Sequence, residues 1–490
     1  MSRETTGSSA LDRIVDANSA MRVWTVVLDD DPTGTQSIAG LPVLTPGFTD
    51  TDLQWAAEQQ SLTTFVLTNS RSVGADTAEM LTTDVIGRAS SVARQKGLTL
   101  RLISRSDSTL RGHFATEVAA AHRALRAAGT PAHGTVFVPA FIEAGRVTID
   151  DVQWVRSGAG FVPAARTEFA KDATFGYTED NLLDWVQGRM DAAAPRAVSI
   201  GIPELRSQDG VSRVSARIAE LHPEGVLVAN AADARDLEVL MLGLLEQERA
   251  GRRPVIRSGP SFVRLCAGQH PADPLASDAI DVRNTGLVVI GSHTALTNAQ
   301  FAAAYREHDL HLVELDAAAV VTDENASSAA EVSRCVREIS SALESGDVVI
   351  RTSRTVLTSG RTTPLLTSNA IADALVEVVS RVVGRRRPGF LIAKGGITSS
   401  DMAVRALATR RALVLGQMLP GTIPIWKLLD GISPGLPYVV FPGNVGAENA
   451  LSAVLAKLRG ATPERGTQSE RLPAGGDGVL VDDPRTTGLP

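Results

Sequence analysis

The feature that most constrains the fold is a regular alternation between short apolar runs rich in β-branched residues and longer alanine-rich stretches. Apolar runs occur at 23–28, 63–67, 99–104 and 135–138. Each ends in turn-forming or charged residues, which is typical of buried strands. The stretches between them have the apolar spacing of amphipathic helices. Strands that alternate with helices predict an α/β fold with a largely parallel sheet.

The alternation occurs twice along the 490 residues, more than one hydrophobic core usually serves. Residues 266–285 separate the two regions and are polar, proline-containing and without a period. We therefore predict two domains, each a largely parallel or mixed sheet flanked by helices. The predicted divisions are a polar N-terminal segment (1–20), a first domain (21–270), a linker (271–285), a second domain (286–460) and a disordered tail (461–490).

Residues 146–195 interrupt the alternation of the first domain with aromatic residues and turns. Two interpretations are open for this segment. It is either a β excursion from the main sheet or a loop that folds over a site.

Charge and composition limit the classes of function. The formal net charge is −7, which argues against nonspecific binding to nucleic acid or a membrane surface. The two cysteines are far apart and have no metal-ligand spacing, so we expect free thiols in a reducing compartment. The first twenty residues lack the apolar core of a signal peptide, and no later apolar run would span a bilayer. These features predict a cytoplasmic protein, and they leave a homodimer open.

Three consecutive carboxylates, Asp29, Asp30 and Asp31, follow the first apolar run. Adjacent carboxylates repel one another unless a metal, a basic partner or a proton relieves them. An Asp-rich turn can also be ordinary solvated turn chemistry. The buried strand expected before it favours a functional role.

Hydroxyl, arginine and carboxylate side chains follow the next two predicted strands. The carboxyl ends of parallel strands meet at one edge of a sheet, so we expect these loops to converge with the aspartates. Arginine can hold a carboxylate with two hydrogen bonds, and hydroxyl and Asp groups can bind substrate hydroxyls. The alternative is that Arg71 and Arg111 only pair with Asp107 and cap helices. The predicted ligand is a small polyhydroxylated anion, bound by Ser70, Arg71, Arg105, Asp107, Ser108, Thr109 and Arg111.

Three glycine turns follow apolar runs in the second region, at 291–294, 394–400 and 442–446. Glycine lets backbone amides approach an anion, and a helix that follows directs its positive end at that anion. Neither a P-loop nor an intact GxGxxG motif is present. The three turns together predict a nucleotide phosphate site, and His293 within the first of them stays unassigned.

The motifs together resemble the four-carbon acid sugar kinase family. The resemblance covers about 23–457 and rests on Asp30-Asp31-Pro32-Thr33-Gly34, Thr68-Asn69-Ser70-Arg71, the run from Arg105 to Gly112, and Pro139-Ala140-Phe141 with Gly145-Arg146. It implies that the first domain binds a sugar acid such as threonate, erythronate or 3-oxo-tetronate. It implies that the second binds ATP through Ser292, Gly395, Gly396, Ile397, Thr398, Gly443, Asn444 and Gly446.

Phosphoryl transfer requires positioning and charge neutralisation, so we expect Mg²⁺ and cationic groups at the γ-phosphate between the domains. The metal ligands are not identified by the sequence. Our hypothesis is that Asp31 orients or deprotonates the attacking hydroxyl, with Asp30 as the alternative. Arg71, Arg105 and Arg111 would hold the sugar-acid carboxylate.

The chain departs from the family pattern at Pro32, Arg105 and Phe441, where the family commonly has an aromatic residue, Lys and Lys. The change at Phe441 removes a phosphate-binding charge. Lys394 and Lys427 are candidates to replace it.

Two rival functions remain at this stage. The run from Asp29 to Thr35 also resembles the nucleophile loop of haloacid-dehalogenase-type phosphatases, with Asp29 phosphorylated and Asp31 as the acid and base. A sugar-acid or nucleotide sensor without turnover is the other alternative.

Overall fold

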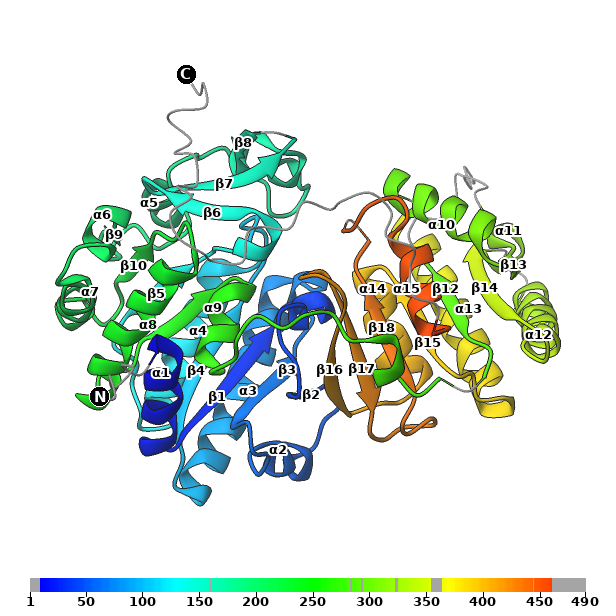
Figure 1. Cartoon of the computed structure of the whole chain (residues 1–490), viewed down its shortest axis with the longest axis horizontal. Helices are drawn as coiled ribbons and strands as arrows, with labels where there is room; N and C mark the ends of the chain where they lie inside the picture. The colour runs from blue at the N-terminus through cyan, green and yellow to red at the C-terminus, as the bar shows by residue number, and fades with distance from the viewer. Residues whose placement is uncertain are drawn as a thin grey trace, which may run out of the picture.

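The computed structural model describes residues 9–158, 160–282, 284–291, 294–321, 325–353, 364–443 and 445–460. Its centre is one sheet of fifteen strands that runs through the whole molecule (Figure 1). The strand order is β13-β14-β12-β15-β18-β17-β16-β2-β3-β1-β4-β11-β5-β10-β9. The α/β fold class predicted from the sequence is therefore confirmed, but the two predicted sheets are joined into one.

The N-terminal half of the sheet consists of parallel strands. Its members are β1 (Val23–Asp29), β2 (Pro42–Leu44), β3 (Thr63–Leu67), β4 (Thr99–Arg105), β5 (Thr135–Val138), β9 (Val198–Ile200), β10 (Val226–Ala229) and β11 (Val255–Ser258). All seven residues of β1 are buried, as expected for a central strand with both faces covered. The covering helices include α3 (Ala75–Lys96), α4 (Phe114–Ala127) and α8 (Ala234–Arg249).

The C-terminal half is mixed. Parallel strands β12 (Leu287–Ile290), β13 (Leu310–Leu315), β14 (Asp347–Thr352), β15 (Leu391–Lys394) and β18 (Pro437–Phe441) are followed in the sheet by an antiparallel hairpin, β16 (Arg411–Leu419) and β17 (Ile423–Leu428). Its helices include α10 (Ala295–Glu307), α12 (Asn325–Ala342), α13 (Pro364–Arg385), α14 (Gly396–Asp401) and α15 (Ala450–Leu458).

The two halves meet where β16 pairs antiparallel with β2. Backbone hydrogen bonds extend this pairing, from Gly40 N to Val414 O (2.7 Å) and from Val414 N to Leu41 O (2.9 Å). The buried Trp426 indole also donates to Thr35 Oγ1 at 2.9 Å. The halves therefore share hydrogen bonds and core, which the sequence did not predict.

Two segments refine the sequence predictions. Residues 146–163 form a separate antiparallel sheet of β6 (Arg146–Ile149), β7 (Val152–Ser157) and β8 (Gly160–Pro163), which matches the β excursion. The predicted polar segment 1–20 includes a helix, α1 (Ala10–Ala20), with a Ser9–Asp12 capping box and buried Leu11, Ile14 and Ala17. The amphipathic spacing of this helix was missed. The predicted tail at 461–490 lies outside the described residues.

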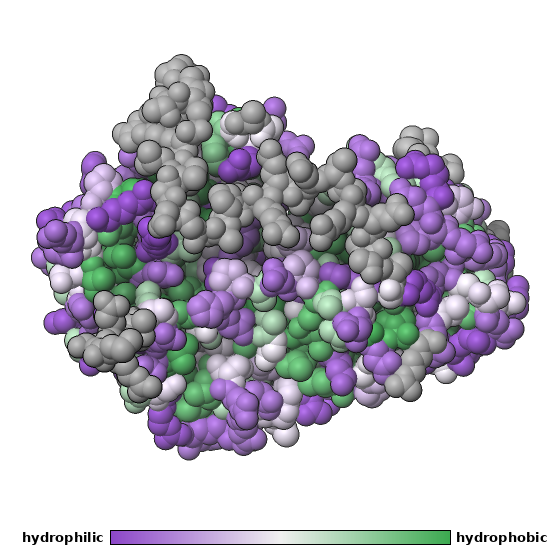
Figure 2. All heavy atoms as spheres, viewed as in Figure 1, coloured by the Kyte–Doolittle hydropathy of each residue, from purple (hydrophilic) through white to green (hydrophobic). Residues whose placement is uncertain are grey.

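Hydrophilic side chains cover most of the periphery of the face in Figure 2, and apolar side chains gather near the middle of the molecule. Among the described helices, none combines the length and hydropathy needed to cross a bilayer.

Candidate active site

A cavity of about 780 Å³ lies between the two halves. From the N-terminal half it is lined by Asp31, Thr33, Gln36, Asn69, Arg71, Ser72, Arg105, Asp107, Ser108, Arg111, Phe141, Ala144 and Arg146. From the C-terminal half it is lined by Gly291, Thr294, Gly395, Gly396, Ile397, Thr398, Thr422, Pro442, Gly443, Val445 and Gly446. Most of the residues predicted to bind the sugar acid thus share one cavity with the described residues predicted to bind the nucleotide.

The three consecutive aspartates have different environments. Asp29 and Asp30 are buried, each 2% exposed, and neither lines the cavity. Burial raises the pKa of Asp29 to about 7, against the opposing effect of Arg105. Asp31 does reach the cavity, because it caps the 3-10 turn Pro32–Thr35 instead of continuing the strand. Only one of the three carboxylates is thus placed to meet a ligand.

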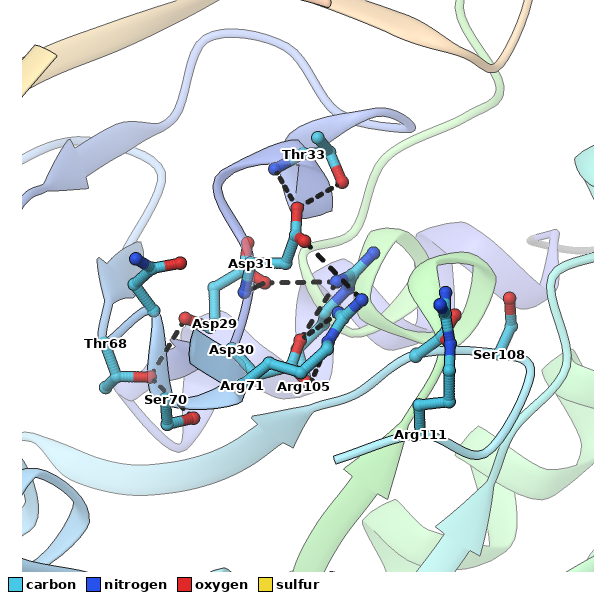
Figure 3. A network of polar contacts seen from close by, with 12 residues as sticks. Asp29, Asp30, Asp31, Thr33, Thr68, Ser70, Arg71, Arg105, Ser108 and Arg111 are labelled. Carbon is cyan, nitrogen blue, oxygen red and sulfur yellow. Dashed lines mark hydrogen bonds and ion pairs between the residues drawn. The ribbon is translucent and has the colours of Figure 1, made fainter. Parts of the chain in front are cut away.

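Asp31 is held as a charged carboxylate. Its Oδ1 accepts hydrogen bonds from Thr33 N (2.8 Å) and Thr33 Oγ1 (2.5 Å), and its Oδ2 lies 3.5 Å from Arg71 Nη1 (Figure 3). Burial acts to raise the pKa of Asp31, but Arg71 and the Thr33 hydrogen bonds outweigh it, and the pKa is lowered.

Buried aspartates fix the two arginines beside Asp31. Arg71 Nη2 donates to Asp30 Oδ1 at 2.7 Å, and Arg105 Nη1 lies 3.3 Å from both Asp29 and Asp30 (Figure 3). Buried ion pairs of this kind orient side chains more than they stabilise a fold. Asp30 is therefore placed as a partner of the arginines, and not as a group that faces substrate.

A second polar group lies further along the cavity. Arg111 Nε donates to Asp107 Oδ2 at 2.6 Å, and Arg146 Nη1 donates to Ser108 Oγ at 2.7 Å. Both guanidinium groups also lie over the Phe169 ring, at 5.2 and 5.4 Å from its centroid. Arg146 Nε is buried without a hydrogen-bond partner. This part of the cavity can accept further negative charge.

Ser70 and Thr109 support the site from behind. Ser70 Oγ donates to the buried Glu117, which also pairs with the buried Arg257. Thr109 Oγ1 donates to Asp107 Oδ2. Neither lines the cavity, in contrast to the other predicted substrate-binding residues, Arg71, Arg105, Asp107, Ser108 and Arg111.

The glycine turns form the opposite wall. They follow β12, β15 and β18, which are adjacent and parallel, so all three leave the sheet at one edge. Gly395 has φ = 117°, a conformation that favours glycine. A Cβ on Gly291 would lie 2.3 Å from Thr398 Oγ1, and one on Gly396 would lie 3.1 Å from Asp31 Oδ2. The Asp31 carboxylate therefore lies directly against the Gly396 turn.

The strand pairings would not lead one to expect that loops from the two halves line the same cavity. Counted through β17, β16 and β2, the strands of the N-terminal half run opposite to β12, β15 and β18. A flat sheet would put the two sets of carboxyl ends at opposite edges. Sheet twist of about 20–25° per strand pair, accumulated from β18 to β1, turns the two sets toward one cavity.

Neither candidate lysine lines this cavity. Lys394 is fully buried, and its Nζ donates to Pro442 O at 3.2 Å and lies 4.0 Å from the Phe441 ring centroid. Burial lowers the pKa of Lys394 to about 7. Lys427 is exposed and lines a separate cavity of about 400 Å³.

Some candidate site residues lie outside the described residues, and others were not selected from the sequence. Ser292, His293 and Asn444 are outside the described residues. Arg146 was noted in a motif but given no role, although it contributes a guanidinium to the cavity. Gln36 and Phe141 were also missed. Phe141 follows β5 as closely as Ser108 follows β4, but it was noted only as part of a motif. Gln36 lies beyond the 3-10 turn that follows β1, so the strand-end argument could not select it.

The described residues contain no group of three or more His, Cys, Asp or Glu side chains that could hold a metal. Mg²⁺ usually keeps several waters and takes one or two carboxylates plus substrate phosphates. Asp31 therefore suits a Mg²⁺ carried in by a nucleotide.

Two family models match the chain. Residues 25–265 match a model described as a sugar-binding N-terminal domain, and residues 287–451 match one described as a nucleotide-binding C-terminal domain. Fold and site thus define a protein in which sugar-binding and nucleotide-binding parts share a cavity. The chain belongs to the four-carbon acid sugar kinase family.

Three curated relatives agree with this assignment. A D-threonate kinase of Bordetella bronchiseptica is 27% identical over 82% of this chain and 88% of its own length. A D-threonate kinase of Salmonella typhimurium is 25% identical over 88% and 97%. A D-erythronate kinase of Heliobacterium modesticaldum is 26% identical over 71% and 76%.

Solved structures share the fold. A Salmonella typhimurium protein has a TM-score of 0.64 at 19% identity, over 88% of this chain and 98% of its own. A Haemophilus influenzae protein has a TM-score of 0.60 at 18% identity, over 88% and 100%.

Proposed function

We propose that the protein phosphorylates a hydroxyl of a small sugar acid of about four carbons, such as a threonate, an erythronate or a 3-oxo-tetronate, with ATP as the donor. The observation that carries this proposal is the single cavity, with arginines and hydroxyls on one wall and glycine turns on the other. Relatives named D-threonate and D-erythronate kinases support the choice of acid. In this scheme residues 21–270 bind the acid, 286–460 bind the nucleotide, and 271–285 link them.

The acid would be held by its carboxylate at one end of the cavity. Arg111 and Arg146 present guanidinium groups there, and the carboxylate would supply the partner that Arg146 Nε lacks. Ser108 and Asp107 lie beside them and can bind substrate hydroxyls. Arg71 and Arg105 both act electrostatically on Asp31, where charge develops during transfer.

Asp31 would orient the attacking hydroxyl toward the γ-phosphate. It belongs to the N-terminal half and lies against the Gly396 turn, so it stands at the boundary between the two ligands. Its lowered pKa makes it a weak base at neutral pH. A loose phosphoryl-transfer transition state needs little proton removal before the bond to the leaving group breaks, so orientation is the larger contribution.

ATP would bind with its phosphates over the glycine turns, where backbone amides approach an anion closely. Mg²⁺, which would neutralise the phosphate oxygens, would be held by those phosphates and by Asp31. We place the reaction in the cytoplasm, an assignment supported by the two buried free thiols, Cys266 and Cys335.

The geometry favours this function over the phosphatase. A phosphatase would need Asp29 exposed as a nucleophile, whereas Asp29 is buried, paired with Arg105 and away from the cavity. A sensor without turnover would use the same cavity, and it differs only in producing no ADP.

Measuring ADP release with a panel of four-carbon sugar acids tests the proposal. We expect ADP formation that depends on the acid, with threonates, erythronates or 3-oxo-tetronates as the best acceptors. Phosphate-ester hydrolysis without ATP would favour the phosphatase. Binding of both ligands without ADP would favour the sensor.

A further inference from the structure

Lys394 is a buried amine that the reaction scheme above does not use. It ends β15 in direct register with Phe441, which ends β18. The side chain is fully buried, and no carboxylate among the described residues forms an ion pair with it. A lysine in this situation is rare, because an isolated buried ammonium is costly without a counter-charge.

The lysine lies directly behind two turns of the C-terminal wall of the cavity. Its backbone leads into Gly395 and Gly396, and its Nζ donates to Pro442 O at 3.2 Å. Gly395 N also donates to Phe441 O at 2.8 Å. Lys394 therefore cross-links the Gly395–Gly396 turn to the Pro442–Gly443 turn, and its charge lies one residue layer below the cavity.

The surrounding groups favour a cation without neutralising it. The Phe441 ring, 4.0 Å from Nζ, and the Pro442 carbonyl present only partial negative charge. Lowering of the Lys394 pKa by burial agrees with a missing counter-charge. Nucleotide phosphates over the same turns would supply it.

We propose that Lys394 is the positioning residue of the nucleotide wall: it holds two glycine turns together and favours ligands in proportion to their phosphate charge. This rests on the proposed function, since it assumes that the turns bind phosphates. The cation would act on the phosphates through the two turns, from the position on β15 in register with Phe441. Lys427 does not share the role, because it lies in another cavity.

The test is calorimetric titration of AMP, ADP and ATP into wild type, Lys394→Met and Lys427→Met. We expect Lys394→Met to weaken ATP about tenfold, ADP less, and AMP within about twofold, because the electrostatic energy grows with ligand charge. Lys427→Met should match wild type for all three. A merely structural role would weaken AMP and ATP by the same factor.

A second variant separates loss of the charge from loss of the lysine side chain. Lys394→Arg retains the charge, so its ratio of ATP to AMP affinity should stay within about twofold of wild type. Equal losses for AMP and ATP in Lys394→Met, or a reduced ratio in Lys394→Arg, would overturn the inference. Wild-type protein that binds no nucleotide would instead defeat the proposed function.

Discussion

The two walls of the cavity recognise negative charge in different ways. The N-terminal wall presents charged side chains that buried partners orient, such as Arg71 held by Asp30. The C-terminal wall presents backbone turns, with one buried lysine behind them. Side chains in fixed positions can distinguish the hydroxyls of one sugar acid from another, whereas backbone amides suit the phosphates that all nucleotides share.

The difference extends to the energetics of the buried charges. Most buried arginines of the N-terminal half have carboxylate partners, such as Arg71 with Asp30, Arg105 with Asp29, and Arg101 with Glu248 at 2.5 Å. Lys394 has no such partner among the described residues. The N-terminal wall therefore neutralises most of its buried charge internally and leaves Arg146 for its ligand, whereas Lys394 depends on the ligand of the other wall for any counter-charge.

The largest expected effect on turnover comes from Asp31, which lies at the contact between the two walls. Asp31→Asn keeps the size of the side chain and its hydrogen bond from Thr33 N, but removes the charge. We expect kcat to fall by about 10²–10⁴, with the affinity for ATP in the absence of Mg²⁺ preserved. Steady-state kinetics and titration of ATP test this, with the exposed Asp84→Asn as the control. Turnover near wild type would remove Asp31 from the mechanism.

Matched substitutions to Met should then separate the buried charges of the two halves. Breaking the Arg101–Glu248 pair with Arg101→Met should destabilise the fold by about 3–5 kcal/mol. Lys394→Met removes an unpaired charge and should stabilise the protein by on the order of 4 kcal/mol at pH 7.

The stabilisation by Lys394→Met should depend on pH. The pKa of Lys394 is lowered from 10.5 to about 7, so between these values the folded protein binds fewer protons than the unfolded chain. Wild-type stability therefore rises with pH through that window, and the advantage of Met disappears above about pH 10.5. Urea unfolding from pH 6 to 10 measures the trend. A constant difference would contradict an unpaired lysine.

Arg111→Gln tests the N-terminal wall alone. Loss of one charge-assisted hydrogen bond, about 1.5–3 kcal/mol, should raise the KM for the sugar acid about 10- to 100-fold. The KM for ATP should not change. Arg166→Gln, at an exposed ion pair with Asp180, is the control. Equal changes in both KM values would show that the walls do not act separately.

The smallest expected effect on activity comes from Gly396, in a glycine turn of the C-terminal wall. A Cβ from Gly396→Ala would lie 3.1 Å from Asp31 Oδ2 and crowd the contact between the walls. Overpacking of this kind costs about 1–3 kcal/mol, so kcat/KM for ATP should fall about tenfold. Gly384→Ala, where a Cβ meets nothing within 4 Å, should be neutral. Identical kinetics for the two variants would argue against the contact.

The sequence predicted the fold class because β-branched runs such as Val23–Leu28 are long and end abruptly in turn residues. It missed the joining of the two sheets. β2 has only three residues, too few for a period, and the pairing of β16 with β17 contains register shifts. Such pairing depends on tertiary contacts and not on local pattern.

The candidate site shows the same limit. Strand-end reasoning selected Arg71, Asp107 and Arg111, because parallel strands deliver their loops to one edge. It put Asp31 ahead of Asp30 only as a hypothesis, since the different exposure of the two depends on the 3-10 turn at Pro32–Thr35. The sequence also did not predict the burial of Lys394, because lysine is usually exposed.

The central claim is that one cavity brings a sugar acid and ATP together for transfer across Asp31. Incubation with γ-labelled ATP and D-threonate or D-erythronate tests it most directly. We predict that the label appears on the sugar acid with wild type and is strongly reduced with Asp31→Asn. Label released only as inorganic phosphate, at a rate independent of any four-carbon sugar acid, would contradict the claim.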